Sequence, residues 1–148
     1  MKLEMLLQHI EPVQLHGSVE VEVLGLTLDS RQVEKGFLYA ALPGTQVDGH
    51  DFIDASITAG AQVILCSTLP EAQIEGVSYV MVSNVSENLG RLASTFYGNP
   101  SSELEVVAIT GTNGKTTCTS LLYDLFTNLG HTCGLLSTVE VKVGKKVY

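Results

Sequence analysis

The first hundred residues alternate between short apolar runs and segments whose apolar residues recur at helical spacing. Apolar residues at the helical period predict an opening helix that ends before Pro12. Five strands are predicted from apolar or alternating runs, at 19–23, 26–28, 37–42, 63–66 and 79–82. One further helix is predicted between the turn at 48–51 and Gly60, and another after Ser83 and Asn84, which are both cap candidates. Strands that alternate with helices predict an α/β fold.

The strongest break in this pattern is the run Gly-Asn-Pro-Ser-Ser at 98–102, where turn-forming residues cluster. After it, an apolar strand at 105–110, a Gly-rich loop, a helix and a strand at 134–137 predict a βαβ unit. We therefore expect a first domain at 1–98, a linker at 99–102 and a second domain at 103–148. An alternating segment at 139–143, followed by Gly144, predicts a final hairpin.

Residues 103–148 are too few to complete a doubly wound nucleotide-binding sheet. Such a sheet needs several more strands and an acidic metal-binding residue on one of them. We therefore expect the chain to be the front of a larger protein, with its second domain truncated.

The Gly-rich loop at 111–117, Gly-Thr-Asn-Gly-Lys-Thr-Thr, has the strand and helix context of a phosphate-binding loop. Backbone N–H groups and the positive end of the following helix hold phosphates in such loops. Lys115 is expected to reach the β- and γ-phosphates of ATP, and the Thr116 hydroxyl to bind Mg²⁺, so these two are the candidate catalytic residues. The full set of candidate ATP-binding residues is Gly111, Thr112, Asn113, Gly114, Lys115, Thr116 and Thr117.

The match is to a shortened loop, because the first Gly of the longer consensus would fall at Ile109. A Gly-rich turn with an exposed lysine is the alternative interpretation. Cys118 beside the loop is expected to be a packed or lining thiol rather than a reactive one.

Composition and charge exclude several other classes of protein. Among 148 residues, 8 are Lys or Arg and 16 are Asp or Glu, and a net charge of −8 argues against nucleic acid as a partner. No apolar run approaches the roughly 20 residues of a membrane-spanning helix, so no membrane insertion is expected. Three cysteines without a paired spacing argue against disulfides or a zinc site. We expect a soluble, cytoplasmic protein.

The loop at 111–117 resembles the ATP loop of the Mur ligase family, whose members join amino acids to UDP-N-acetylmuramoyl peptides during peptidoglycan synthesis. The first hundred residues resemble the UDP-binding domain of the same family. The segments that carry this likeness are Thr-Leu-Asp-Ser-Arg at 27–31, Gly-Phe-Leu-Tyr-Ala-Ala-Leu-Pro-Gly at 36–44, Asp-Gly-His-Asp-Phe-Ile at 48–53, Gly-Ala at 60–61 and Phe-Tyr at 96–97. The resemblance therefore implies a small α/β UDP-binding domain followed by the opening of a P-loop ATPase-like central domain.

By this resemblance, five residues contact the UDP-linked substrate: Leu28, Ser30, Thr45, Gln46 and Val47. Many relatives carry His where this chain has Thr45. Turn capping is the alternative role for Ser30 and Thr45. For Asp29 and Arg31, an ion pair that fixes the loop competes with ligand contact, and His50 is expected to cap a turn.

The chemistry that the resemblance implies is ATP-dependent amide formation through an acyl phosphate, with a UDP-N-acetylmuramoyl dipeptide as substrate. The pattern is most similar to members that add the third amino acid, meso-diaminopimelate or L-lysine, to UDP-N-acetylmuramoyl-L-alanyl-D-glutamate. The D-alanyl-D-alanine-adding members and a generic P-loop nucleotide-binding module are the alternatives. The remaining catalytic groups of the family, and the rest of its central and C-terminal domains, lie beyond Tyr148, so the chain alone is expected to be inactive.

Overall fold

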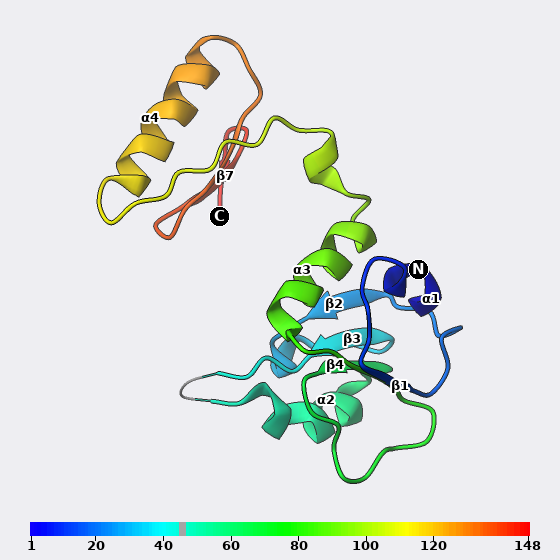
Figure 1. Cartoon of the computed structure of the whole chain (residues 1–148). Helices are drawn as coiled ribbons and strands as arrows, with labels where there is room; N and C mark the ends of the chain where they lie inside the picture. The colour runs from blue at the N-terminus through cyan, green and yellow to red at the C-terminus, as the bar shows by residue number, and fades with distance from the viewer. Residues whose placement is uncertain (45–46) are drawn as a thin grey trace. The chain divides into compact units, whose positions relative to one another are not determined.

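The computed structural model describes residues 1–44 and 47–148, which divide into two compact units. The first unit is Met1–Leu104 and the second is Glu105–Tyr148. Figure 1 shows the helices and strands of both units.

The first unit contains a five-stranded sheet with the strand order β1-β5-β4-β3-β2. The four strands β2 to β5 run parallel, and β1 pairs with β5 antiparallel at one edge. The strands are β1 (Gln14–His16), β2 (Gly25–Thr27), β3 (Phe37–Ala40), β4 (Val63–Cys66) and β5 (Ser78–Met81). The helices are α1 (Leu3–Leu7), α2 (Ile53–Ala59) and α3 (Val85–Phe96), with 3-10 turns η1 (Ser30–Gln32), η2 (Gly49–Phe52) and η3 (Pro100–Ser102).

Helices cover both faces of this sheet, with α1 and α3 on one face and α2 on the other (Figure 1). Side chains alternate between the faces along each strand: Leu38 and Ala40 pack under α1 and α3, whereas Tyr39 lies on the face covered by α2. Strands buried on both faces read as continuous apolar runs, which explains why β4 is apolar throughout. The predicted α/β fold is confirmed for the first unit, and its sheet is mainly parallel.

Local signals mark the helical segments near the predicted turns. Asp48 accepts the backbone N–H of His50 at the start of η2, which leads directly into α2. Gly60 ends α2 with a left-handed φ of 117°. Asn84 caps α3 by accepting the backbone N–H of Glu87 at 3.1 Å.

The strand predicted at 19–23 is wrong. This segment makes an isolated antiparallel bridge from Glu22 to Lys2, with hydrogen bonds from the Leu3 N–H to the Val21 carbonyl and from the Val23 N–H to the Met1 carbonyl. Its partner is the start of the chain, which coils into α1 at Leu3 and cannot extend the ladder. The edge strand β1, only three residues long, was not predicted.

The second unit consists of α4 (Lys115–Asn128) and a three-stranded antiparallel sheet in the order β6-β7-β8. The strands are β6 (Gly134–Leu136), β7 (Val141–Val143) and β8 (Lys146–Val147). The predicted helix and the hairpin that turns at Gly144 are confirmed. Among residues 105–148, all of which the structure describes, Leu135 is the one buried hydrophobic residue.

The βαβ unit predicted for the second domain is not formed. Residues 105–110 are in no strand, and Val106 and Val107 are 68% and 67% exposed. A strand requires a hydrogen-bonded neighbour, and β6 pairs with β7 through antiparallel bonds instead. The apolar residues at 105–110 therefore favour burial of this segment, but they do not identify a strand within residues 105–148 with which it could pair.

Candidate functional site

The predicted phosphate loop, at 111–117, leads directly into α4 in the second unit. Gly111 and Gly114 have positive φ angles of 147° and 77°, and Gly114 is the N-cap of α4. A Cβ built on Gly114 would meet no atom within 4 Å, so its backbone angle, rather than crowding, favours glycine there. The first N–H groups of α4 have no intrahelical partner and carry partial positive charge, which suits them to bind an anion.

Lys115 lies folded across this loop. Its exposed ammonium group donates hydrogen bonds to the carbonyl oxygens of Gly111 and Thr112, the latter at 3.3 Å. The lysine thus shares the loop with the backbone groups expected to contact phosphate. Thr112, Asn113 and Thr117 are exposed and Thr116 is half-buried, so the predicted residues are gathered at one end of α4.

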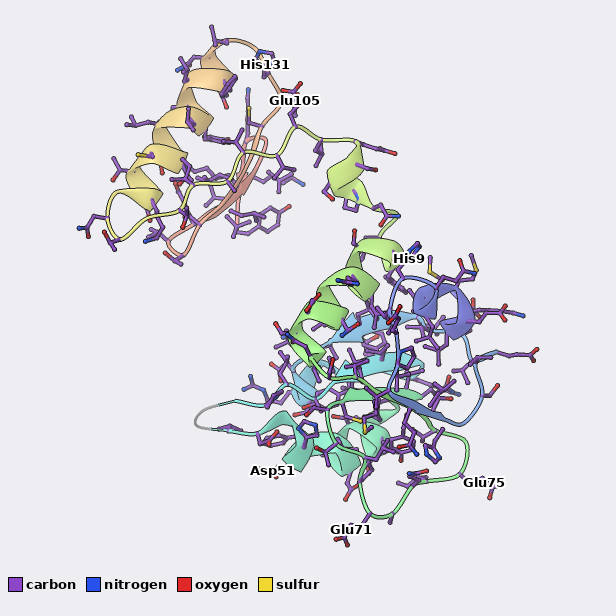
Figure 2. The ribbon with its side chains drawn as sticks, in the orientation of Figure 1. His9, Asp51, Glu71, Glu75, Glu105 and His131 are labelled. Carbon is purple, nitrogen blue, oxygen red and sulfur yellow. The ribbon has the colours of Figure 1, made fainter. Side chains whose placement is uncertain are left out.

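Thr116 is the one predicted metal ligand. No cluster of three or more His, Cys, Asp or Glu side chains able to hold a metal occurs among residues 1–44 and 47–148. In Figure 2 the labelled residues of the first unit, His9, Asp51, Glu71 and Glu75, project at separate points of its surface. A single hydroxyl still fits Mg²⁺, which usually takes few protein ligands and fills its coordination with phosphate oxygens and water.

The predicted substrate residues follow the carboxyl ends of parallel strands in the first unit. Leu28 and Ser30 come after β2, and Val47 comes after β3. Leu28 and Val47 are each 60% exposed, although both are apolar. Thr45 and Gln46 lie outside the described residues. The carboxyl edge of a parallel sheet is where open α/β folds bind ligands, so these positions suit a substrate site.

Asp29 and Arg31 form an ion pair at this edge. Arg31 donates from Nε to Oδ1 of Asp29 at 2.9 Å and from Nη2 to Oδ2 at 2.7 Å. The Arg31 backbone N–H also donates to Oδ1, at 3.0 Å. The guanidinium hydrogen bonds, followed by the backbone one, lower the pKa of the Asp29 carboxyl to about 2. The ion pair holds the turn that presents Ser30. This geometry corresponds to the first of the two roles considered for Asp29 and Arg31, an ion pair that fixes the loop, rather than to ligand contact.

Asp29→Asn should remove a contribution to stability that depends on pH. Because the pKa of Asp29 is lowered on folding from 3.8 to about 2, its contribution is complete above pH 3.8 and is lost as the pH falls through about 2. Thermal unfolding midpoints of wild type and Asp29→Asn, compared between neutral pH and pH 2, should therefore converge on acidification. A constant difference across this range would contradict the ion-pair assignment.

A second group of contacts, centred on His50, lies at the same edge. Its Nδ1 is 2.7 Å from Oδ1 of Asp48, and its Nε2 is 3.1 Å from the backbone nitrogen of Ser67. The hydrogen bonds from His50 to Asp48 hold the pKa of that carboxyl below its usual value. A shallow cleft of about 330 Å³ lies beside them. It is lined by Asp48, His50, Ile53, Ser67, Thr68, Leu69 and Pro70.

This arrangement differs from the sequence prediction in two ways. Asp48, rather than the His50 ring, caps the turn. Ser67 was not predicted as part of any site, and the one available signal was its place directly after an apolar strand. The Cys66 thiol, in the residue before Ser67, is buried in β4. Burial raises the pKa of this thiol to about 11, which makes it unreactive.

Residues 22–97 match the family model described as "Mur ligase family, catalytic domain". A ligase of Bacteroides fragilis named UDP-N-acetylmuramoyl-L-alanyl-D-glutamate--2,6-diaminopimelate ligase is 50% identical over 139 residues, which are 94% of this chain and 29% of that protein. A ligase of the same name from Geobacillus kaustophilus is 37% identical over 148 residues, 100% of this chain and 30% of that protein. The chain thus spans about 30% of the length of these relatives.

Solved structures of related ligases share the fold. A structure of a UDP-N-acetylmuramoyl-L-alanyl-D-glutamate--2,6-diaminopimelate ligase superposes with a TM-score of 0.73 and 23% identity, over 99% of this chain and 29% of that one. A MurF ligase from Thermotoga maritima in complex with ADP superposes with a TM-score of 0.56 and 31% identity, over 73% and 24%. No helix among residues 1–44 and 47–148 is both long and apolar enough to cross a bilayer.

Proposed function

The chain belongs to the Mur ligase family, and from this premise we propose that it is the N-terminal part of an ATP-dependent ligase that adds diaminopimelate to UDP-N-acetylmuramoyl-L-alanyl-D-glutamate. The observation that carries this proposal is the 50% identity, over 94% of the chain, to a relative named for that reaction. The first unit is then the UDP-binding domain, and the second is the opening of the ATP-binding central domain. Such a ligase would act in the cytoplasm, in peptidoglycan synthesis.

The phosphate loop would bind ATP through the N-terminal end of α4. The neighbour solved with ADP supports a nucleotide in this family. The Lys115 ammonium would turn from the Gly111 carbonyl toward the β- and γ-phosphates, and Thr116 would offer its hydroxyl to Mg²⁺. Mg²⁺ supplies stabilisation of the charge on the transferring phosphoryl group.

The reaction would proceed in two steps. A substrate carboxylate oxygen attacks the γ-phosphorus of ATP, ADP leaves, and an acyl phosphate forms. The amine of diaminopimelate then attacks the acyl carbon, phosphate leaves, and an amide bond forms with loss of a proton from nitrogen. Of the groups required, this chain supplies the loop that orients the phosphates, which is where positioning and charge stabilisation act in phosphoryl transfer.

The carboxyl edge of the first sheet would bind the UDP end of the substrate. Ser30, held by the Asp29–Arg31 pair, offers a hydroxyl, and Leu28 and Val47 offer exposed apolar contacts. The likeness to D-alanyl-D-alanine-adding ligases in the solved structures keeps that reaction as the second candidate. The higher identity to diaminopimelate-adding relatives favours the first.

Calorimetric titration of the chain with UDP-N-acetylmuramoyl-L-alanyl-D-glutamate tests the substrate site. Ser30→Ala removes one hydrogen-bonding hydroxyl and should weaken this ligand about threefold to tenfold. The affinity for a non-hydrolysable ATP analogue with Mg²⁺ should not change, and Ser86→Ala, at an exposed serine of α3, should alter neither. Binding of the ATP analogue without any binding of the sugar nucleotide would contradict the proposed substrate site in the first unit.

A further inference from the structure

The imidazole of His50 joins the ends of two neighbouring parallel strands. His50 follows β3 in the segment that leads into α2, whereas Ser67 directly follows β4. The ring nitrogen Nε2 lies 3.1 Å from the Ser67 backbone nitrogen and 3.2 Å from its Oγ, and the side chain is 18% exposed. Because a backbone N–H can only donate, Nε2 is the acceptor and the ring hydrogen is on Nδ1. That hydrogen is donated to Oδ1 of Asp48.

The segment that His50 fastens also carries a candidate substrate residue. Asp48 accepts both the ring hydrogen and the backbone N–H of His50, and Val47 precedes it. Behind this segment, the Gly49 N–H donates to the Leu42 carbonyl at 2.8 Å. The Gly49 carbonyl also accepts a hydrogen bond from the Tyr39 hydroxyl of β3 at 2.9 Å, and the His50 ring connects the segment to Ser67 at the end of β4.

Asp, His and Ser side chains in contact also occur in hydrolases, where the histidine removes a proton from the serine. Here the Nε2 lone pair already accepts the Ser67 backbone N–H, which leaves it unsuited to serve as a base toward the Ser67 hydroxyl. The geometry therefore favours a role in positioning.

We propose that His50 is a positioning residue for the sugar-nucleotide site, in which its ring, held between Asp48 and the Ser67 N–H, fixes Val47 relative to the end of β4. This inference rests on the proposed function, since it concerns the UDP-linked substrate. His50 touches no substrate in this role. Its effect passes through the backbone that it holds.

Four variants separate positioning from simple stability. His50→Phe keeps a ring without hydrogen bonds and should weaken binding of UDP-N-acetylmuramoyl-L-alanyl-D-glutamate about tenfold or more. His50→Gln, whose amide can donate to Asp48 and accept from Ser67, should restore most of the affinity. Asp48→Asn keeps an oxygen that can accept from His50, and Ser67→Ala keeps the backbone N–H that donates to it. The affinity of each variant for the sugar nucleotide should therefore stay within about threefold of wild type. None of the four should change the affinity for an ATP analogue.

A measurement without ligand makes the test independent of the proposed function. Imidazole ¹⁵N spectra should show hydrogen on Nδ1 and none on Nε2 of His50, and amide exchange at Val47 and Ser67 should be faster in His50→Phe than in wild type or His50→Gln. If wild type binds the sugar nucleotide and His50→Phe binds it equally well, the positioning role is wrong and the proposed function stands. If the wild-type chain does not bind the sugar nucleotide, the proposed substrate is wrong. In that case, an amide exchange rate at Val47 that is the same in His50→Phe and wild type would overturn the positioning role as well.

Discussion

Replacing Lys115 by alanine should weaken binding of a non-hydrolysable ATP analogue about tenfold to a hundredfold. Hydrogen bonds that involve a charged group contribute about 1.5–3 kcal/mol each, and about 1.4 kcal/mol corresponds to a tenfold change in affinity. Lys115 is the cation of the loop, and its ammonium already lies against the Gly111 and Thr112 carbonyls, within the loop expected to receive the phosphates. Calorimetric titration in the presence of Mg²⁺ measures the effect directly.

The control for this substitution is Lys145→Ala, which removes an exposed lysine from the β7–β8 turn of the same unit. Both variants lose one positive charge, so a general electrostatic effect would weaken binding equally in the two. We expect Lys145→Ala to bind the analogue as wild type does. Equal losses in the two variants would remove the basis for assigning Lys115 to the β- and γ-phosphates.

The sequence predicted best what is determined locally. Val63–Cys66 was predicted to be a strand with the bounds that β4 has, because a short apolar run between turns can be buried on both faces. The turn at 48–51, the pair at 83–84 and Gly60 are predicted to mark helix ends because capping depends on a few neighbouring residues. The glycines and lysine of the loop at 111–117 are likewise adjacent in sequence, and the phosphate-binding role of this loop stays a prediction.

What the sequence could not predict depends on partners far along the chain. The segment 19–23 alternates like a strand, yet its backbone hydrogen bonds go to the first four residues rather than into the sheet. The apolar run at 105–110 pairs with no strand among the described residues. Strand pairing is a property of two segments, and the alternation of one segment does not identify the other.

The same distinction applies within the candidate sites. The ion pair of Asp29 and Arg31 spans two residues and was proposed from the sequence as an alternative to ligand contact. The contact between His50 and Ser67 spans seventeen residues and follows from the parallel pairing of β3 with β4, which brings their carboxyl ends together. A serine after a strand is too common to indicate such a role by itself.

Gly49→Ala should lower the free energy of unfolding of the first unit by about 1–3 kcal/mol, the usual cost of overpacking. A Cβ on Gly49 would lie 2.6 Å from the backbone nitrogen of Leu42 and 2.8 Å from its carbonyl oxygen, and backbone atoms cannot rotate away. Relief requires the segment to move away from β3. That movement would strain the Gly49–Leu42 hydrogen bond and the one from the Tyr39 hydroxyl to the Gly49 carbonyl at 2.9 Å. Urea unfolding followed by near-ultraviolet circular dichroism, to which the buried Tyr39 and Tyr79 rings contribute, measures the change.

Gly90→Ala is the matched control, with the same added methyl group and the opposite expected sign. Gly90 is an exposed residue inside α3, and a Cβ there would meet nothing within 4 Å. Alanine in a helix interior is more favourable than glycine by about 0.5–1 kcal/mol, so this variant should be more stable than wild type. Since the moved segment carries Val47 and Asp48, Gly49→Ala should also weaken sugar-nucleotide binding, which Gly90→Ala should leave unchanged. Equal stability of the two variants would show that the segment before α2 can move without a cost in free energy. A substrate site that depends on a fixed position of Val47 would then be contradicted.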